Sequence, residues 1–193
     1  MIKLFIAAAM TIVLSGTTAI AAPNGTFRQA HEYGYGDKSS LDPASRGRVM
    51  QITEKLMSRL IRPDMKGSPS PDLATSWSSN DEATVWTLNL REGVKFHDGS
   101  GFDSGDVIYT FSRVLDPENK SPARSAIKMI EKMEAPDDMT VKFTLSTPFA
   151  DMPLQLMDYR LRIIPENSGD SIATSGIGTG PFKLVSYDAA GVT

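Results

Sequence analysis

The side chains best suited to acid–base chemistry are the two histidines, His31 and His97, and the chain has no cysteine. His97 precedes Asp98, but a catalytic base needs a nucleophile and an orienting partner within reach, which adjacency in sequence does not supply. The pair Asp98-Gly99 is typical of a turn instead. Two histidines far apart in sequence, without cysteine and without a D-x-D-x-D-G loop, also make a poor metal site. We therefore predict no catalytic residue, no metal site and no cofactor.

The run Gly176-Ile177-Gly178-Thr179-Gly180 resembles a loop that cradles phosphate. Such a loop must follow a strand and open a helix, whose N-terminus then faces the anion. Here Pro181 follows at once, and the alternating run Phe182–Val185 predicts a strand. The glycines therefore indicate a tight crossing, where one backbone approaches another too closely for a side chain.

The composition narrows the class of protein. The 193 residues carry 20 basic and 23 acidic side chains, a formal net charge of −3. A nucleic-acid binder would show a basic balance, so no nucleic-acid partner is expected. The lack of cysteine excludes a disulfide scaffold, a thiolate zinc site and an iron–sulfur cluster.

The first 21 residues have the pattern of a signal peptide. Lys3 supplies the positive charge, Leu4 to Leu14 form an apolar run, and Ala19-Ile20-Ala21 is an A-x-A cleavage site. The run is shorter than the roughly 20 residues of a membrane span. An ordinary N-terminal helix is the alternative. We expect cleavage after Ala21 and, without a cysteine for a lipid anchor, a free periplasmic protein.

Hydrophobic periodicity then predicts the helices and strands in the first half of the mature chain. Residues 26–33 alternate as a strand, and residues 49–61 place apolar side chains on one helical face. Residues 63–71, rich in proline, predict an extended loop. Trp77 and the alternating run Val85–Leu90 predict two strands of a hairpin, with a turn at residues 79–81.

The second half begins with the clearest helix. Asp103 is placed to cap it, Asp106 completes an approximate capping box, and an apolar stripe runs to Leu115 before Asp116-Pro117 ends it. The elements expected after it are a short helix starting at Ser121-Pro122, a turn at 137–138, a strand at 141–145, a helical turn at 154–157, and strands at 161–164 and 182–187. Without a strict βαβ rhythm, the fold class is α/β in the mixed α+β sense.

Several short segments, taken in their order along the chain, resemble those of one protein family. The solute-binding proteins of ABC importers, in the peptide and nickel class (family 5, related to oligopeptide and dipeptide binders), are similar in these pieces: Leu41-Asp42-Pro43, Leu60-Ile61-Arg62, Pro71-Asp72-Leu73-Ala74, Val85-Trp86-Thr87-Leu88, Leu90 to Gly99, Asp106 to Phe111, Asp116-Pro117, Ala135 to Asp138, Pro148-Phe149-Ala150 and Gly178 to Leu184. The predicted signal peptide agrees with this resemblance independently.

The resemblance implies a two-lobed fold like that of type II periplasmic binding proteins, incomplete in this chain. Residues 22–44 and 175–193 would be pieces of the main lobe, and residues 45–174 would form a smaller inserted domain. Several hundred further residues would complete the main lobe and supply the facing lobe. An alternative is a truncated product without a stable function.

The resemblance also implies a site. Cleft-lining backbone of the family corresponds to Ser45, Arg46, Gly47 and Arg48, and the two arginines could meet a ligand carboxylate. The alternative is that they are solvated loop charges. Oligopeptide binders carry an aromatic residue where this chain has Ala123. The resemblance thus makes Ala123 a substrate-binding position, although its small side chain weakens the case for oligopeptides.

The function implied is capture of a peptide or peptide-like solute, followed by docking on a membrane permease that a separate ATPase drives. The protein would be a monomer and would not be an enzyme. The alternatives are a periplasmic sensor, a binder of nickel or another small solute, and a secreted hydrolase, which would need a nucleophile–base pair.

Overall fold

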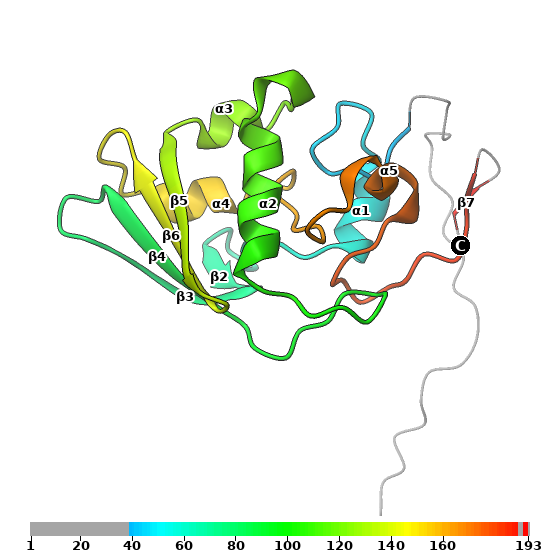
Figure 1. The fold of residues 1–193 in the computed structure, drawn as a ribbon, viewed down its shortest axis with the longest axis horizontal. Helices are drawn as coiled ribbons and strands as arrows, with labels where there is room; N and C mark the ends of the chain where they lie inside the picture. The colour runs from blue at the N-terminus through cyan, green and yellow to red at the C-terminus, as the bar shows by residue number, and fades with distance from the viewer. Residues whose placement is uncertain (1–38, 189–190, 193) are drawn as a thin grey trace, which may run out of the picture. The chain divides into compact units, whose positions relative to one another are not determined.

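A computed structural model describes residues 39–188, 191 and 192, which all lie in one compact unit (Figure 1). The predicted signal peptide with its cleavage site at Ala21, the strand expected at residues 26–33 and His31 lie outside the described residues. The element bounds below are those of the described part.

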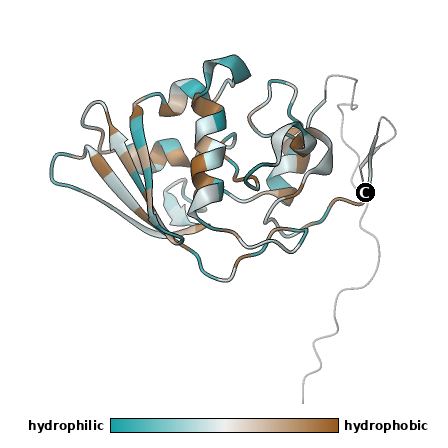
Figure 2. Ribbon diagram, in the orientation of Figure 1, coloured by the Kyte–Doolittle hydropathy of each residue, from teal (hydrophilic) through white to brown (hydrophobic). Residues whose placement is uncertain are grey.

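The centre of the fold is a four-stranded antiparallel sheet in the order β3-β4-β6-β5. Its strands are β3 (Ala74–Ser79), β4 (Val85–Leu90), β5 (Ile130–Asp137) and β6 (Thr140–Leu145). The predicted hairpin is confirmed as β3–β4, and Trp86 of β4 lies opposite Phe143 of β6. Alternate residues of β4 and β6 are buried, as a sheet with one covered face requires. Hydrophobic and more polar residues alternate along the strands of the sheet in Figure 2.

The helix α2 (Ser104–Leu115) packs on this sheet. Val107, Phe111 and Val114 are buried, and the Phe111 ring stacks on Phe143 with centroids 5.0 Å apart. The capping box is confirmed, with both hydrogen bonds between Asp103 and Asp106 present. The predicted end at Asp116 is confirmed as well, and the short helix η1 (Pro117–Asn119) follows.

The helix expected over residues 49–61 is shorter in the structure. Helix α1 covers only Met50–Leu56, because the chain then becomes extended and pairs with a later segment. The Arg59 amide donates to the Asp72 carboxylate at 3.0 Å, and Leu60 O accepts from the Ala74 amide at 2.9 Å. Because these backbone groups bond to the later segment, they are not available for the hydrogen bonds that would continue the helix. The loop expected over residues 63–71 is also corrected, since β1 (Ile61–Pro63) and β2 (Pro69–Pro71) form a small hairpin.

Strand β5 was not expected from the sequence. Only Ile130 of its eight residues is buried, so the strand lacks the alternation that would reveal it. The segments expected as strands at 161–164 and 182–187 are not strands apart from the last residue, Tyr187. Arg162 makes a single antiparallel bridge with Arg59, and Tyr187–Asp188 (β7) pairs with Gly191–Val192 (β8).

The remaining helices are short. Helix α3 (Arg124–Ile127) starts two residues after Pro122, later than expected, and α4 (Met152–Leu156) confirms the predicted helical turn. The last two are η2 (Gly169–Ser171) and α5 (Ile172–Ser175). None of the helices in the described residues is long and apolar enough to cross a membrane.

Buried side chains form two clusters. The larger fills the space between α2 and the sheet and extends to α4. The second cluster joins both ends of the described chain and consists of Leu41, Ile52, Leu56, Met57, Ile164 and Ile172. It brings α1 against the segment that leads into α5, and so supports the loop before α1.

Candidate functional site

A polar hollow of about 340 Å³ opens beside the loop that precedes α1. It is lined by Asp42, Ala44, Ser45, Arg46, Arg113, Asn119, Lys120 and Asp170. The lining comes from three places in the sequence: the loop, the C-terminal end of α2 with η1, and η2. Both charge signs are present, so the hollow can accommodate a solute that carries both.

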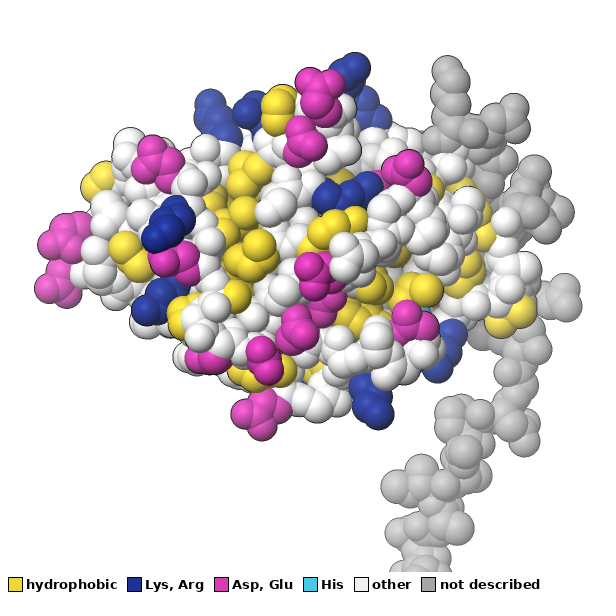
Figure 3. All heavy atoms as spheres, viewed as in Figure 1, with side chains coloured by type: hydrophobic (Ala, Val, Ile, Leu, Met, Phe, Trp, Pro, Cys, Tyr) yellow, Lys and Arg dark blue, Asp and Glu magenta, His cyan; other side chains and the backbone are white. Residues whose placement is uncertain are grey.

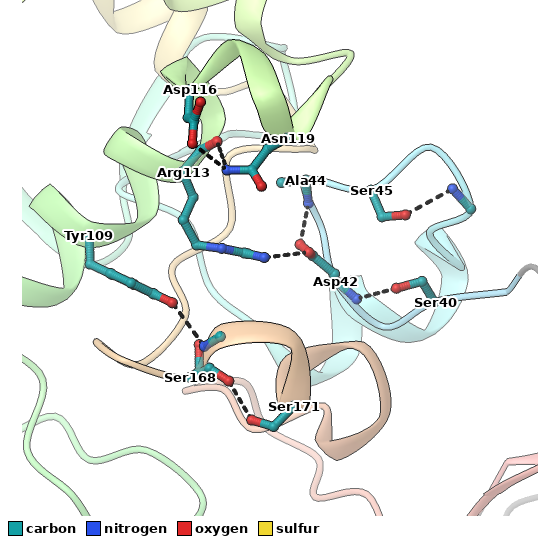
Figure 4. A network of polar contacts seen from close by, with 12 residues as sticks. Ser40, Asp42, Ala44, Ser45, Tyr109, Arg113, Asp116, Asn119, Ser168 and Ser171 are labelled. Carbon is teal, nitrogen blue, oxygen red and sulfur yellow. Dashed lines mark hydrogen bonds and ion pairs between the residues drawn. The ribbon is translucent and has the colours of Figure 1, made fainter.

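The loop is held closed by its own backbone. The Ser40 amide donates to Gly47 O at 2.8 Å, and the Val49 amide donates back to Ser40 O at 2.9 Å. Within it, the Asp42 carboxylate accepts from the Ala44 amide at 2.9 Å (Figure 4). These short-range bonds fix Ser45 and Arg46 at the edge of the hollow.

Asp42 also ties the loop to α2. Its other carboxylate oxygen lies 3.0 Å from Arg113 Nη2, and both side chains are largely buried (Figure 4). Asn119 donates to Arg113 O at 3.0 Å and so closes the end of the helix. Arg113 Nη1 is buried without a hydrogen-bond partner among the described residues. This ion pair positions one wall of the hollow, and the amino group Nη1 of Arg113 stays without a partner among the described residues.

A second group lies around the exposed ring of Tyr159. Arg48 donates through Nη2 to the Tyr159 hydroxyl at 2.7 Å and through Nη1 to Ser45 O at 3.1 Å. The guanidinium carbons of Arg48 and Arg160 lie 5.0 and 5.5 Å from the ring centroid, within cation–π range. Ser45 connects this group to the hollow, because its carbonyl binds Arg48 while the residue lines the hollow.

Arg160 is paired with Asp158 through two hydrogen bonds and also donates to Pro122 O at 2.7 Å. Burial works against ionisation of Asp158, but the hydrogen bonds from Arg160 and the charges of Arg160 and Arg48 lower the pKa of the Asp158 carboxyl overall. The same bond to Asp158 raises the pKa of Arg160. The pair is therefore fully ionised at neutral pH.

The four predicted residues Ser45, Arg46, Gly47 and Arg48 share one loop, with Ser45 and Arg46 at the hollow and Arg48 bound to Tyr159. Gly47 contributes backbone: its amide donates to Ser45 Oγ at 3.1 Å. The side chain of Ala123 is fully buried, although the carbonyl just before it belongs to Pro122, which Arg160 binds. A role of these five residues in binding solute stays a prediction.

Sequence reasoning missed the partners of that loop. Arg113 lies 71 positions after Asp42 and Tyr159 lies 111 positions after Arg48, so no local pattern connects them. Only the close Asp158–Arg160 spacing could have been noticed as a local ion pair.

His97 has a structural role in the described chain. Its Nε2 lies 2.9 Å from Gly180 O, and its Nδ1 accepts from the Gly178 amide at 3.3 Å. A neutral ring with the proton on Nε2 satisfies both contacts. The histidine therefore holds the glycine segment in place through both ring nitrogens. No group of three or more potential metal ligands occurs among the described residues.

The glycine segment lies against the end of α1. The Gly180 amide donates to Leu56 O at 2.8 Å, and a Cβ on Gly178 or Gly180 would overlap the carbonyl oxygens of Leu56 and Lys55. The predicted tight crossing is confirmed. A helix, α5, precedes the glycines and does not follow them, so the arrangement is not that of a phosphate loop.

Curated relatives are matched over part of their length. The chain is 36% identical over 120 residues to the glutathione-binding protein GsiB of Pectobacterium atrosepticum, which covers 60% of this chain and 23% of that protein. It spans between about a quarter and a third of the first curated relatives that it matches.

Solved structures agree in fold. The periplasmic binding protein AgaA of A. tumefaciens R10, in complex with agropinic acid, has a TM-score of 0.71 at 34% identity, over 80% of this chain and 32% of that one. DppA of Helicobacter pylori, in complex with the peptide STSA, has a TM-score of 0.69 at 30% identity, over 78% and 35%. NikZ of Campylobacter jejuni, in complex with Ni(L-His), has a TM-score of 0.69 at 27% identity, over 77% and 31%.

The expected mixed α/β fold of a type II periplasmic binding protein is thus confirmed for the described part. The model of the bacterial extracellular solute-binding proteins, family 5 middle region, matches residues 68–193, more than half of the chain. This chain belongs to the family 5 extracellular solute-binding proteins.

Proposed function

We propose that the whole protein captures a peptide or peptide-like solute for import by an ABC transporter. The observation that carries the proposal is the hydrogen-bonded loop of residues 40–49, which presents Ser45 and Arg46 to a polar hollow and Arg48 to an exposed tyrosine. Family membership and the names of GsiB and DppA support this solute class.

The mechanism is binding without chemistry. Solute bound between two lobes would favour the closed state by its differential affinity for that state. Arginines and a serine hydroxyl can donate to carboxylate and carbonyl oxygens of a solute. The loaded protein would then dock, as a monomer, on a permease of the inner membrane. No step requires the protein to act as an enzyme.

The periplasm is the compartment in which this function operates. The signal-peptide pattern of residues 1–21 supports it, as does the description of the E. coli relative DdpA as periplasmic.

We also retain the division into main-lobe pieces 22–44 and 175–193 around an inserted domain, 45–174. Leu41 of the first piece belongs to the second core cluster, and Leu184 and Tyr187 of the last piece pack against it, which supports a main lobe built from both pieces.

The test is calorimetric titration of the whole purified protein with short peptides, glutathione, agropinic acid and nickel–histidine. We expect saturable binding of a peptide-like member and a rise in melting temperature, since a ligand that binds only the native state stabilises it. Lack of binding by every peptide-like member would overturn the proposal.

A nickel complex is the second candidate solute, favoured by the likeness to NikZ. In that case the carboxylates of the chelating amino acids would contact the same loop. Tight binding of nickel–histidine together with no binding of peptides would select this candidate.

A further inference from the structure

Tyr159 combines an exposed ring with a polarised hydroxyl. The residue is 40% exposed, and two guanidiniums lie within 5.5 Å of the ring centroid. Its oxygen accepts from Arg48, and no acceptor for its own proton occurs among the described residues. The O–H group is therefore free to donate, and the neighbouring cation makes it a stronger donor.

The charged groups around the Tyr159 ring leave a net positive charge there. Arg160 is neutralised by its two hydrogen bonds to Asp158, whereas Arg48 forms no ion pair within the part of the chain that the structure describes. Arg48 Nε is buried and has no hydrogen-bond partner there. One uncompensated positive charge next to a hydroxyl donor favours an anionic group.

We propose that Arg48 and Tyr159 form the subsite that binds a carboxylate of the solute; this rests on the proposed function. The carboxylate would accept from the Tyr159 hydroxyl and from the free N–H of an Arg48 amino group, while the ring would pack against the planar group next to it. The rest of the solute would extend past Ser45 into the hollow.

The subsite predicts selectivity by charge. A solute whose carboxylate is replaced by an amide places a neutral group beside Arg48 and loses one charge-assisted hydrogen bond. Such a bond is the stronger kind, so the free acid should bind at least about tenfold more tightly than its amide.

The experiment measures dissociation constants of the whole protein for the short peptide that binds most tightly in the calorimetric titration, as the free acid and as the C-terminal amide. The variants are Tyr159→Phe, which keeps the ring, and Arg48→Gln. Lys66→Gln, on the exposed tip of the β1–β2 hairpin, removes the same charge as a control. Circular dichroism and melting temperature check that each variant folds.

We expect the ratio of acid to amide affinity to fall by about tenfold in Tyr159→Phe and Arg48→Gln and to be unchanged in Lys66→Gln. Folded variants that bind solute with the ratio of the unmodified protein would overturn the subsite and leave the proposed function standing. If the unmodified protein binds no peptide-like solute at all, the proposed function fails, and the subsite with it.

Discussion

Arg162 is a cation inside the protein, with only 4% of its surface exposed. It donates through Nη1 to Met57 O at 2.6 Å, and its Nε has no partner among the described residues. Burial, together with the charge of nearby Arg59, lowers the pKa of Arg162 to about 10, although the charges of Glu54 and Asp72 act in the opposite direction. Because a depressed pKa means that the folded state disfavours the charged form, Arg162 costs about 3 kcal/mol of stability at neutral pH.

We therefore expect Arg162→Met to raise the free energy of unfolding at pH 7 by about 1–3 kcal/mol, the lost bond to Met57 offsetting part of the gain. The loss of stability that charged Arg162 causes in the wild-type protein becomes smaller as pH rises above about 10. There Arg162 loses its proton in the folded state but not in the unfolded one. The advantage of the variant should then narrow by about 1 kcal/mol at pH 11. Urea unfolding of both proteins at pH 7, 9 and 11 checks this, and a destabilised variant would contradict it.

The Asp106 carboxylate accepts hydrogen bonds from two backbone amides. Its oxygens accept from Asp103 N at 2.9 Å and from Glu166 N at 2.7 Å, so it caps α2 and fastens residue 166 to it. Burial raises the pKa of Asp106, and the nearby charges of Asp103 and Glu166 add to the rise against the lowering effect of the two amides.

Asp106→Ala leaves both amides unsatisfied, and we expect a loss of about 2 kcal/mol in the free energy of unfolding. Asp81→Ala, in the exposed turn before β4, is the matched control and should change stability by less than about 0.5 kcal/mol. Because the raised pKa means that the ionised form is penalised in the folded state, the loss should be larger at pH 4 than at pH 7. Denaturant unfolding at the two pH values measures both effects.

At the scale of elements, the glycine segment, residues 176–180, packs directly against the C-terminal end of α1, so each constrains the position of the other. Gly178 and Gly180 lie against the last carbonyls of the helix, and His97 holds the other side of the segment. Side chains at these two positions would push the segment away from the helix end.

Gly178→Ala should lower the free energy of unfolding by about 1–3 kcal/mol, because the added methyl overlaps the Leu56 carbonyl. Gly101→Ala is the control, since a Cβ there meets no atom within 4 Å. Thermal or urea unfolding of the two variants compares them. Equal stability of Gly178→Ala and the parent would show that the close approach does not occur.

At the scale of the molecule, α2 connects the two core clusters. One side packs Val107, Phe111 and Val114 toward the sheet, while Tyr109, Thr110 and Arg113 hold the segments of the second cluster. Figure 1 shows α2 between the sheet and the pair α1 and α5. On the face shown in Figure 3, basic and acidic side chains are interspersed around the hydrophobic ones.

Phe111→Ala removes a fully buried ring and should cost about 3–5 kcal/mol. If α2 couples the clusters, hydrogen exchange should quicken at Leu41 and Ile164 as well as in β4 and β6. Faster exchange confined to the sheet would show that the clusters unfold independently.

Elements whose signal is local could be predicted from the amino-acid sequence. The alternation of β4 and β6, the apolar stripe and capping box of α2, and the close approach at Gly178 follow from periodicity, side-chain size and turn chemistry. The order of short motifs also indicated the family.

Features that depend on partners distant in sequence became visible only in the folded chain. Helix α1 ends at Leu56 because the next residues pair with the segment from Asp72 to Ala74, and β5 exists because β6 supplies its hydrogen bonds. Asp42 meets Arg113, and Arg48 meets Tyr159, across 71 and 111 positions. Such contacts depend on how the chain folds back on itself, and periodicity within a short window carries no information about them.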